Sequence, residues 1–122
     1  MIALVRRERG NTFGWIGRSQ APYKEWTWKE TLHRFGGPNF VRLPDGSWWG
    51  AGRSYPGGAK TVLAKMTAGG DYKPVLTFPS GGDTSYPGLV WHDGLLLCGL
   101  RSGFVQGHFD LGQINLRLPF VR

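Results

Sequence analysis

Short apolar runs separated by glycine, proline and polar turns dominate this chain. No run shows the sustained helical spacing of apolar side chains that an amphipathic helix requires. The runs at 88–92 and 95–100 flank Asp93-Gly94, a dipeptide that readily adopts positive φ, so they predict a β-hairpin with Tyr86 at its start. The whole pattern predicts an all-β fold of short strands joined by tight turns.

An internal repeat organises these runs. Residues 43–53 align without gaps on residues 91–101, an offset of 48, and each copy contains an Asp-Gly turn and ends in arginine. Counted back from Arg53, an offset of 47 or 46 reaches Arg6 or Arg7, at the end of the apolar run 2–5. Arginines therefore recur at equivalent places, the last of them at Arg101.

A strand-rich unit of this length matches one blade of a β-propeller. We therefore expect one domain, 1–122, that is a partial β-propeller of two to three antiparallel blades, with blade remnants at about 1–43, 44–91 and 92–122. A closed propeller needs more blades than this, so the prediction is a fragment of a larger propeller, with self-association through exposed blade edges and faces. The rival interpretation is an autonomous β-sandwich with internal symmetry.

Charge and composition limit the kinds of ligand and site that this chain can have. The net charge of +7 favours anionic partners, but the 15 Lys and Arg residues are scattered, which argues against a nucleic-acid interface. The single cysteine, Cys98, excludes an intrachain disulfide, and the three histidines share no metal-ligand spacing. The sequence contains no cofactor fingerprint, no signal-peptide order and no apolar run long enough for a membrane span.

Two features are candidates for chemistry. Arginines at equivalent strand ends could converge on a propeller axis and clamp a carboxylate, or each could mark a solvated strand end. Tyr86 could act as a nucleophile if a carboxylate such as Glu8 or Asp83 assisted it, or its ring could simply pack at a strand start. Both alternatives stay open on spacing alone.

Four stretches, in order along the chain, resemble the sialidases and their bacterial sialidase-like relatives, six-bladed propeller glycoside hydrolases. They are the arginine-bearing run 3–8 with its successor 14–19, the degenerate Asp-box-like hairpin 19–28, the second arginine-bearing stretch 37–54, and the segment 82–94 around Tyr86. The similarity covers about residues 1–97. After Leu97 the chain departs from the family pattern, which weakens Arg101 as a family position and suits a frameshifted or truncated end.

The resemblance implies hydrolysis of a terminal acidic sugar without a cofactor. It implies that Arg7 and Arg53 bind the substrate carboxylate and that Tyr86 attacks the anomeric carbon, a known exception to the two-carboxylate scheme. The family's first arginine and its acid/base aspartate have no counterpart in this chain, so we expect the isolated chain to be inactive. The alternative is a noncatalytic module that binds glycans or a protein partner, which exposure of Trp48 or Trp49 would favour.

Overall fold

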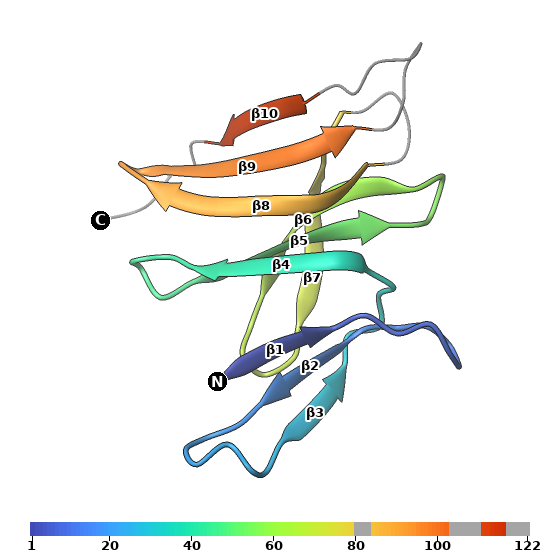
Figure 1. Ribbon diagram of the computed structural model, residues 1–122, viewed down its shortest axis with the longest axis vertical. Coiled ribbons are helices and arrows are strands. Elements are labelled where there is room, and N and C mark those ends of the chain that lie inside the picture. Colours follow the sequence, from blue (N-terminus) through green and yellow to red (C-terminus); the bar gives the residue numbers. More distant parts are fainter. Residues whose placement is uncertain (80–83, 103–110, 117–122) are drawn as a thin grey trace.

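The computed structural model describes residues 1–79, 84–102 and 111–116, and these residues form an all-β structure of three antiparallel sheets without a helix (Figure 1). The first sheet contains β1 (Ile2–Val5), β2 (Trp15–Arg18) and β3 (Thr27–Glu30). The middle sheet contains β4 (Gly36–Arg42), β5 (Trp48–Ser54), β6 (Lys60–Met66) and β7 (Tyr72–Thr77). The last sheet contains β8 (Thr84–His92), β9 (Leu95–Ser102) and β10 (Leu111–Leu116).

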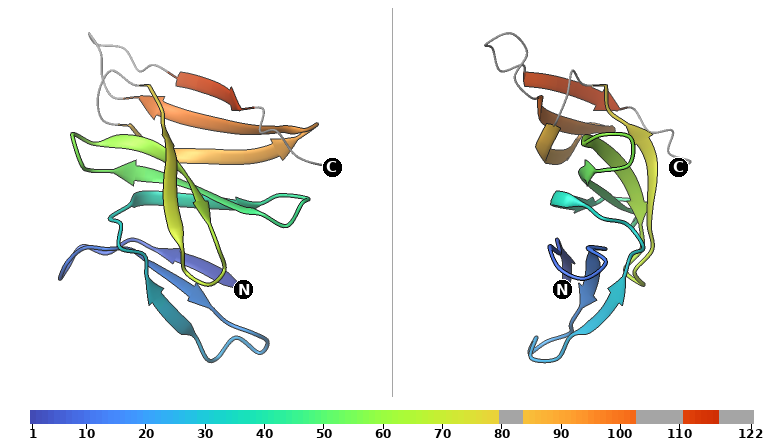
Figure 2. Two further views of the ribbon diagram at one scale, coloured as in Figure 1. Left: turned by 180° about the vertical axis from the view of Figure 1, so that it is seen from behind. Right: turned by 90° about the vertical axis from the view of Figure 1, so that its right-hand side faces the viewer.

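The three sheets are stacked in chain order, with the middle sheet between the other two (Figures 1 and 2). Within each sheet, strands that follow one another in sequence are hydrogen-bonded neighbours. The first strand of the middle sheet, β4, lies between β1 on one side and β8 on the other. The apolar runs of the sequence therefore form an ordered series of similar sheets.

The predicted Asp-Gly hairpins form in both repeat copies. Asp93 and Gly94 both have positive φ (48° and 77°) and connect β8 to β9 through the pair His92 and Leu95, as a type I′ turn does. Asp45-Gly46 closes the β4–β5 hairpin, and the Asp45 carboxylate accepts hydrogen bonds from the amide and hydroxyl of Ser47. These hydrogen bonds lower the pKa of Asp45.

The sheet boundaries differ from the predicted blade boundaries. The chain passes from one sheet to the next through residues 31–35 and 78–83, whereas the boundaries predicted at 43/44 and 91/92 fall inside hairpins. The physical reason is that a tight Asp-Gly turn joins two strands that pair with each other, so it closes a hairpin within a sheet. The crossings to the next sheet instead occupy the segments between β3 and β4 and between β7 and β8.

Two apolar cores fill the interfaces between the sheets. The first sheet packs on the middle sheet through Ile16, Phe35, Ala64 and Met66. The middle sheet packs on the last sheet through a second core of Leu43, Ala51, Leu63, Phe78, Leu96, Cys98 and Leu100. Burial raises the pKa of the Cys98 thiol to about 11, as expected for an inert core cysteine.

Trp48 and Trp49, whose exposure would favour a glycan-binding module, lie against these cores. Trp48 is partly buried against the core between the first and middle sheets, and Trp49 against the core between the middle and last sheets. Since adjacent residues of a strand point to opposite faces, β5 contributes one tryptophan to each interface. Neither ring forms an open platform for a glycan.

Candidate functional site

Tyr86 is the most unusual residue of the described structure. The residue is 74% exposed, and its backbone has φ of 56°, a left-handed conformation that is uncommon for a bulky residue. It lies in a bulge of β8, where the pairing with β9 shifts between Ser85 and Gly88. Bulges and strained backbone positions cluster at functional sites, so this residue is a candidate functional position.

A matching bulge in β4 supports the Tyr86 ring. The pairing of β4 shifts between Gly36 and Asn39, and Gly37 has φ of 52°. Each bulge thus has a left-handed residue followed by proline, at Gly37-Pro38 and at Tyr86-Pro87. A Cβ atom on Gly37 would lie 2.9 Å from Cδ1 of Tyr86, so the ring lies directly over this glycine.

Buried hydrogen bonds hold the start of β8 on the middle sheet. The Thr61 amide donates to Thr84 Oγ1 at 2.8 Å, and the Thr61 hydroxyl donates to the Thr84 carbonyl at 3.1 Å. Arg53 Nε donates to the same carbonyl at 3.4 Å, and Asn39 Nδ2 donates to the Pro87 carbonyl at 3.0 Å. The backbone on both sides of Tyr86 is therefore anchored.

Charged side chains gather around Tyr55, which lies next to the glycine pair that supports this tyrosine. The Arg34 guanidinium lies 4.1 Å from the centre of the Tyr55 ring and 3.3 Å from a Glu8 oxygen, and Glu8 also pairs with Arg6. The Tyr55 ring lies close to Gly36, next to the glycine that supports Tyr86. We call the set Arg6, Glu8, Arg34, Arg53, Tyr55 and Tyr86 the Tyr86 cluster.

Electrostatics connect the members of the Tyr86 cluster. The hydrogen bond with Glu8 raises the pKa of Arg6, and Coulomb attraction to Glu8, Tyr55 and Tyr86 acts in the same direction. The same hydrogen bond lowers the pKa of Glu8, and the charge of Arg34 adds to this effect. Three arginines against one carboxylate leave the cluster positive, which suits an anionic ligand.

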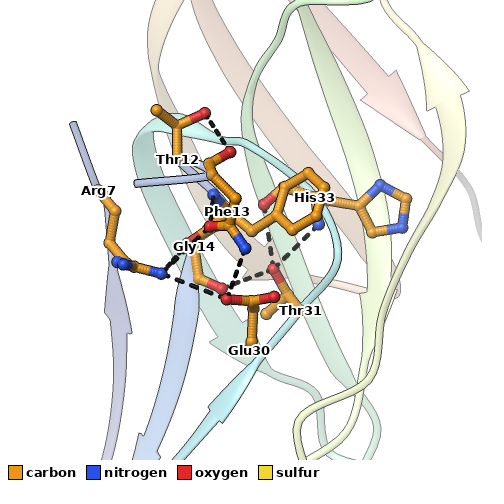
Figure 3. A network of polar contacts seen from close by, with 8 residues as sticks. Arg7, Thr12, Phe13, Gly14, Glu30, Thr31 and His33 are labelled. Carbon is orange, nitrogen blue, oxygen red and sulfur yellow. Dashed lines mark hydrogen bonds and ion pairs between the residues drawn. The ribbon is translucent and has the colours of Figure 1, made fainter. Parts of the chain in front are cut away.

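Arg7, the residue that the family resemblance assigns to the carboxylate, lies in a different network (Figure 3). Its guanidinium stacks 4.4 Å from the centre of the Trp15 ring and pairs with Glu30 at 3.3 Å. It also donates to the Phe13 carbonyl at 3.4 Å. These contacts tie the loop after β1 to β3.

Strand register decides which arginine is the counterpart of Arg53. Thr31 donates to the Gly14 carbonyl and Phe78 to the Thr61 carbonyl, both at 2.9 Å, so β2 and β6 correspond with Gly14 matching Thr61. Trp15 then matches Val62, and their partners on the neighbouring strands are Val5 and Gly52. The next residues along the chain, Arg6 and Arg53, are therefore equivalent.

The structure brings together two residues that the sequence did not single out. Arg34 and Tyr55 lie in the segments that precede β4 and follow β5, outside the aligned repeat. Their only sequence signal is proximity to Gly36-Gly37 and to Arg53. For Arg101 the described feature is backbone pairing with Ser85, and Asp83 lies outside the described residues.

Other kinds of site have less support. Among the described residues, no group of three or more His, Cys, Asp or Glu side chains could hold a metal ion, and no helix could cross a membrane. A depression of about 890 Å³ lies at the opposite end of the first sheet, lined by residues that include Arg18, Lys24 and Trp26. It is separate from the Tyr86 cluster.

Comparisons of this chain with protein-family models, curated proteins and solved structures find no match.

Proposed function

We propose that this chain is part of a sialidase-like propeller glycoside hydrolase and that its three sheets are consecutive blades. The observation that carries the proposal is the Tyr86 cluster, which combines a strained and exposed tyrosine with arginines from three separate segments. Arg53 donates to the backbone two residues before Tyr86, and Arg6 lies within electrostatic reach of it. The repeat along the chain and the stacking of similar sheets in chain order also support it.

In this proposal the arginines bind the carboxylate of a terminal acidic sugar. Arg6 and Arg53 occupy equivalent strand ends and provide two guanidinium groups, each able to form paired hydrogen bonds with a carboxylate. Arg34 adds positive charge from the segment before β4. The role that the family resemblance gives to Arg7 passes to Arg6, because Arg6 is the neighbour of Glu8 and lies within electrostatic reach of Tyr86.

Tyr86 is the proposed nucleophile toward the anomeric carbon. A phenol carries no charge in the resting state, so it does not repel the substrate carboxylate as an aspartate or glutamate would. Negative charge that develops on its oxygen would lie in the field of Arg6. The described residues near it include no free carboxylic acid suited to protonate the leaving group, because Glu8 is held by Arg6 and Arg34.

Binding of a sialoside, measured by NMR titration of the isolated chain, tests the proposal. We expect the free acid to shift signals of residues around Tyr86, and the methyl ester of the same sialoside to bind at least about tenfold more weakly because it lacks the charge. Arg53→Ala should weaken binding of the acid by a similar factor, whereas Arg18→Ala, an exposed arginine of β2, should not.

Two results would contradict this proposal. Equal binding of acid and ester would remove the carboxylate site, and binding without any effect of Arg53→Ala would remove Arg53 from it. Turnover of a fluorogenic sialoside by the isolated chain would show that its catalytic set is complete, against our expectation.

A further inference from the structure

Among the described residues, the two outer faces of the sheet stack carry exposed apolar side chains beside polar positions. Glu30 pairs with Trp15 on the first sheet, and Gln113 and Asn115 pair with Gly99 and Leu97 on the last sheet. Residues paired across a sheet share a face, so Ala3, Gly17 and Trp28 lie on the outer face of the first sheet, as do Val5 and Trp15. Trp28 is 42% exposed and stacks on Trp26 with ring centres 5.4 Å apart. We call this surface the head face.

The last sheet has a corresponding outer face. Val90 pairs with Leu97 and Gly88 pairs with Gly99, on the side opposite the core residues Leu96 and Cys98. Val90 is 55% exposed, and a Cβ atom on either glycine would meet no atom within 4 Å. We call this surface, with its flat glycine strip beside two apolar side chains, the tail face.

The equivalent residues of the middle sheet show which kind of face packs on each outer face. On the head face, Trp15 and Gly17 match Val62 and Ala64 of the middle sheet, and Ala64 is covered by the first sheet. On the tail face, Leu97 and Gly99 match Trp49 and Ala51, which are covered by the last sheet. Each internal interface thus joins a tail-type face to a head-type face of the next sheet.

We infer that a second copy of this chain docks head to tail, with the tail face of one copy on the head face of the other. The Trp28 ring lies flat across Gly17 on the head face, and the Gly88–Gly99 strip provides a second flat surface that can stack on it. Contact between these faces continues the stacking already present twice within the chain. Such a heterologous interface forms a closed ring or an open chain of copies. This inference does not depend on the proposed sugar site.

Light scattering after size-exclusion chromatography, over a range of protein concentrations, tests the inference with three variants. Trp28→Lys damages only the head face, Val90→Lys damages only the tail face, and Val75→Lys is the control. Val75 is also exposed, at 50%, but it lies on β7 of the middle sheet. We expect the wild type and the control to associate, and each face variant alone to dissociate at least about tenfold more readily.

Mixing the two face variants gives the decisive result. A head-to-tail interface predicts that the equimolar mixture recovers dimers, and no larger species, because one intact head and one intact tail remain. Association of either face variant alone at wild-type strength would indicate contact between like faces and would overturn the inference. A wild-type chain that stays monomeric at all concentrations would also overturn it. Circular dichroism of each variant verifies that it is folded.

Discussion

At the scale of single residues, Tyr86 combines backbone strain with exposure. A left-handed conformation costs a residue with a Cβ roughly 1–2 kcal/mol, and asparagine tolerates this conformation better than tyrosine. The residue is 74% exposed, so packing recovers little of that cost. Strain that packing does not explain is consistent with selection for the phenol at this point.

Replacing Tyr86 separates the cost of the backbone strain from the stability that the ring contributes. We expect Tyr86→Asn to raise the free energy of unfolding by up to about 1 kcal/mol, measured by urea denaturation, because asparagine relieves the backbone strain. Tyr86→Phe keeps the strain and should leave the free energy of unfolding unchanged. A loss of stability in the asparagine variant would mean that ring packing over Gly37 outweighs the strain.

At the scale of elements, the Thr61–Thr84 pair fixes the start of β8 to β6. Both side chains are buried, and each hydroxyl has a partner in the pair, with the two oxygens 2.8 Å apart. This contact positions the bulge that carries Tyr86, since Thr84 lies two residues before it. A polar link inside the apolar interface thus connects the fold to the candidate site.

Removing one hydroxyl of the pair should destabilise the fold by more than half of what removing both hydroxyls costs. Thr84→Val leaves the buried Thr61 amide without its acceptor, so we expect a loss of about 1–3 kcal/mol in the free energy of unfolding. The double variant with Thr61→Val should lose less than the sum of the single losses, because the two hydroxyls serve each other. Thr27→Val, on exposed β3, is the control. Additive losses would show that the pair does not act as a unit.

The sequence predicted the strands and hairpins better than their division into sheets. The Asp-Gly turns and the repeat predicted the β4–β5 and β8–β9 hairpins, because turn chemistry is local. The choice between Arg6 and Arg7 could not be made, since both fit the offset and only the pairing of Val5 with Trp15 separates them. Arg34 and Tyr55 were missed because long-range packing, rather than any repeat, brings them to Glu8 and Gly36.

At the scale of the whole molecule, stacking and site formation have a common geometric origin. The sheets follow one another in order, so equivalent strand ends come to one edge of the stack (Figure 1). Arg6 and Arg53 reach this edge from adjacent sheets, and Tyr86 reaches it from the third. The same order leaves the head face and the tail face at the two ends of the stack.

The most direct test of the account compares Arg6→Ala with Arg7→Ala in sialoside binding. Arg6 belongs to the Tyr86 cluster and Arg7 to the network with Trp15 and Glu30. We predict that Arg6→Ala weakens binding of the acidic sugar at least about tenfold, whereas Arg7→Ala changes it less than about twofold while the fold is retained. Loss of binding in Arg7→Ala with wild-type binding in Arg6→Ala would contradict the account.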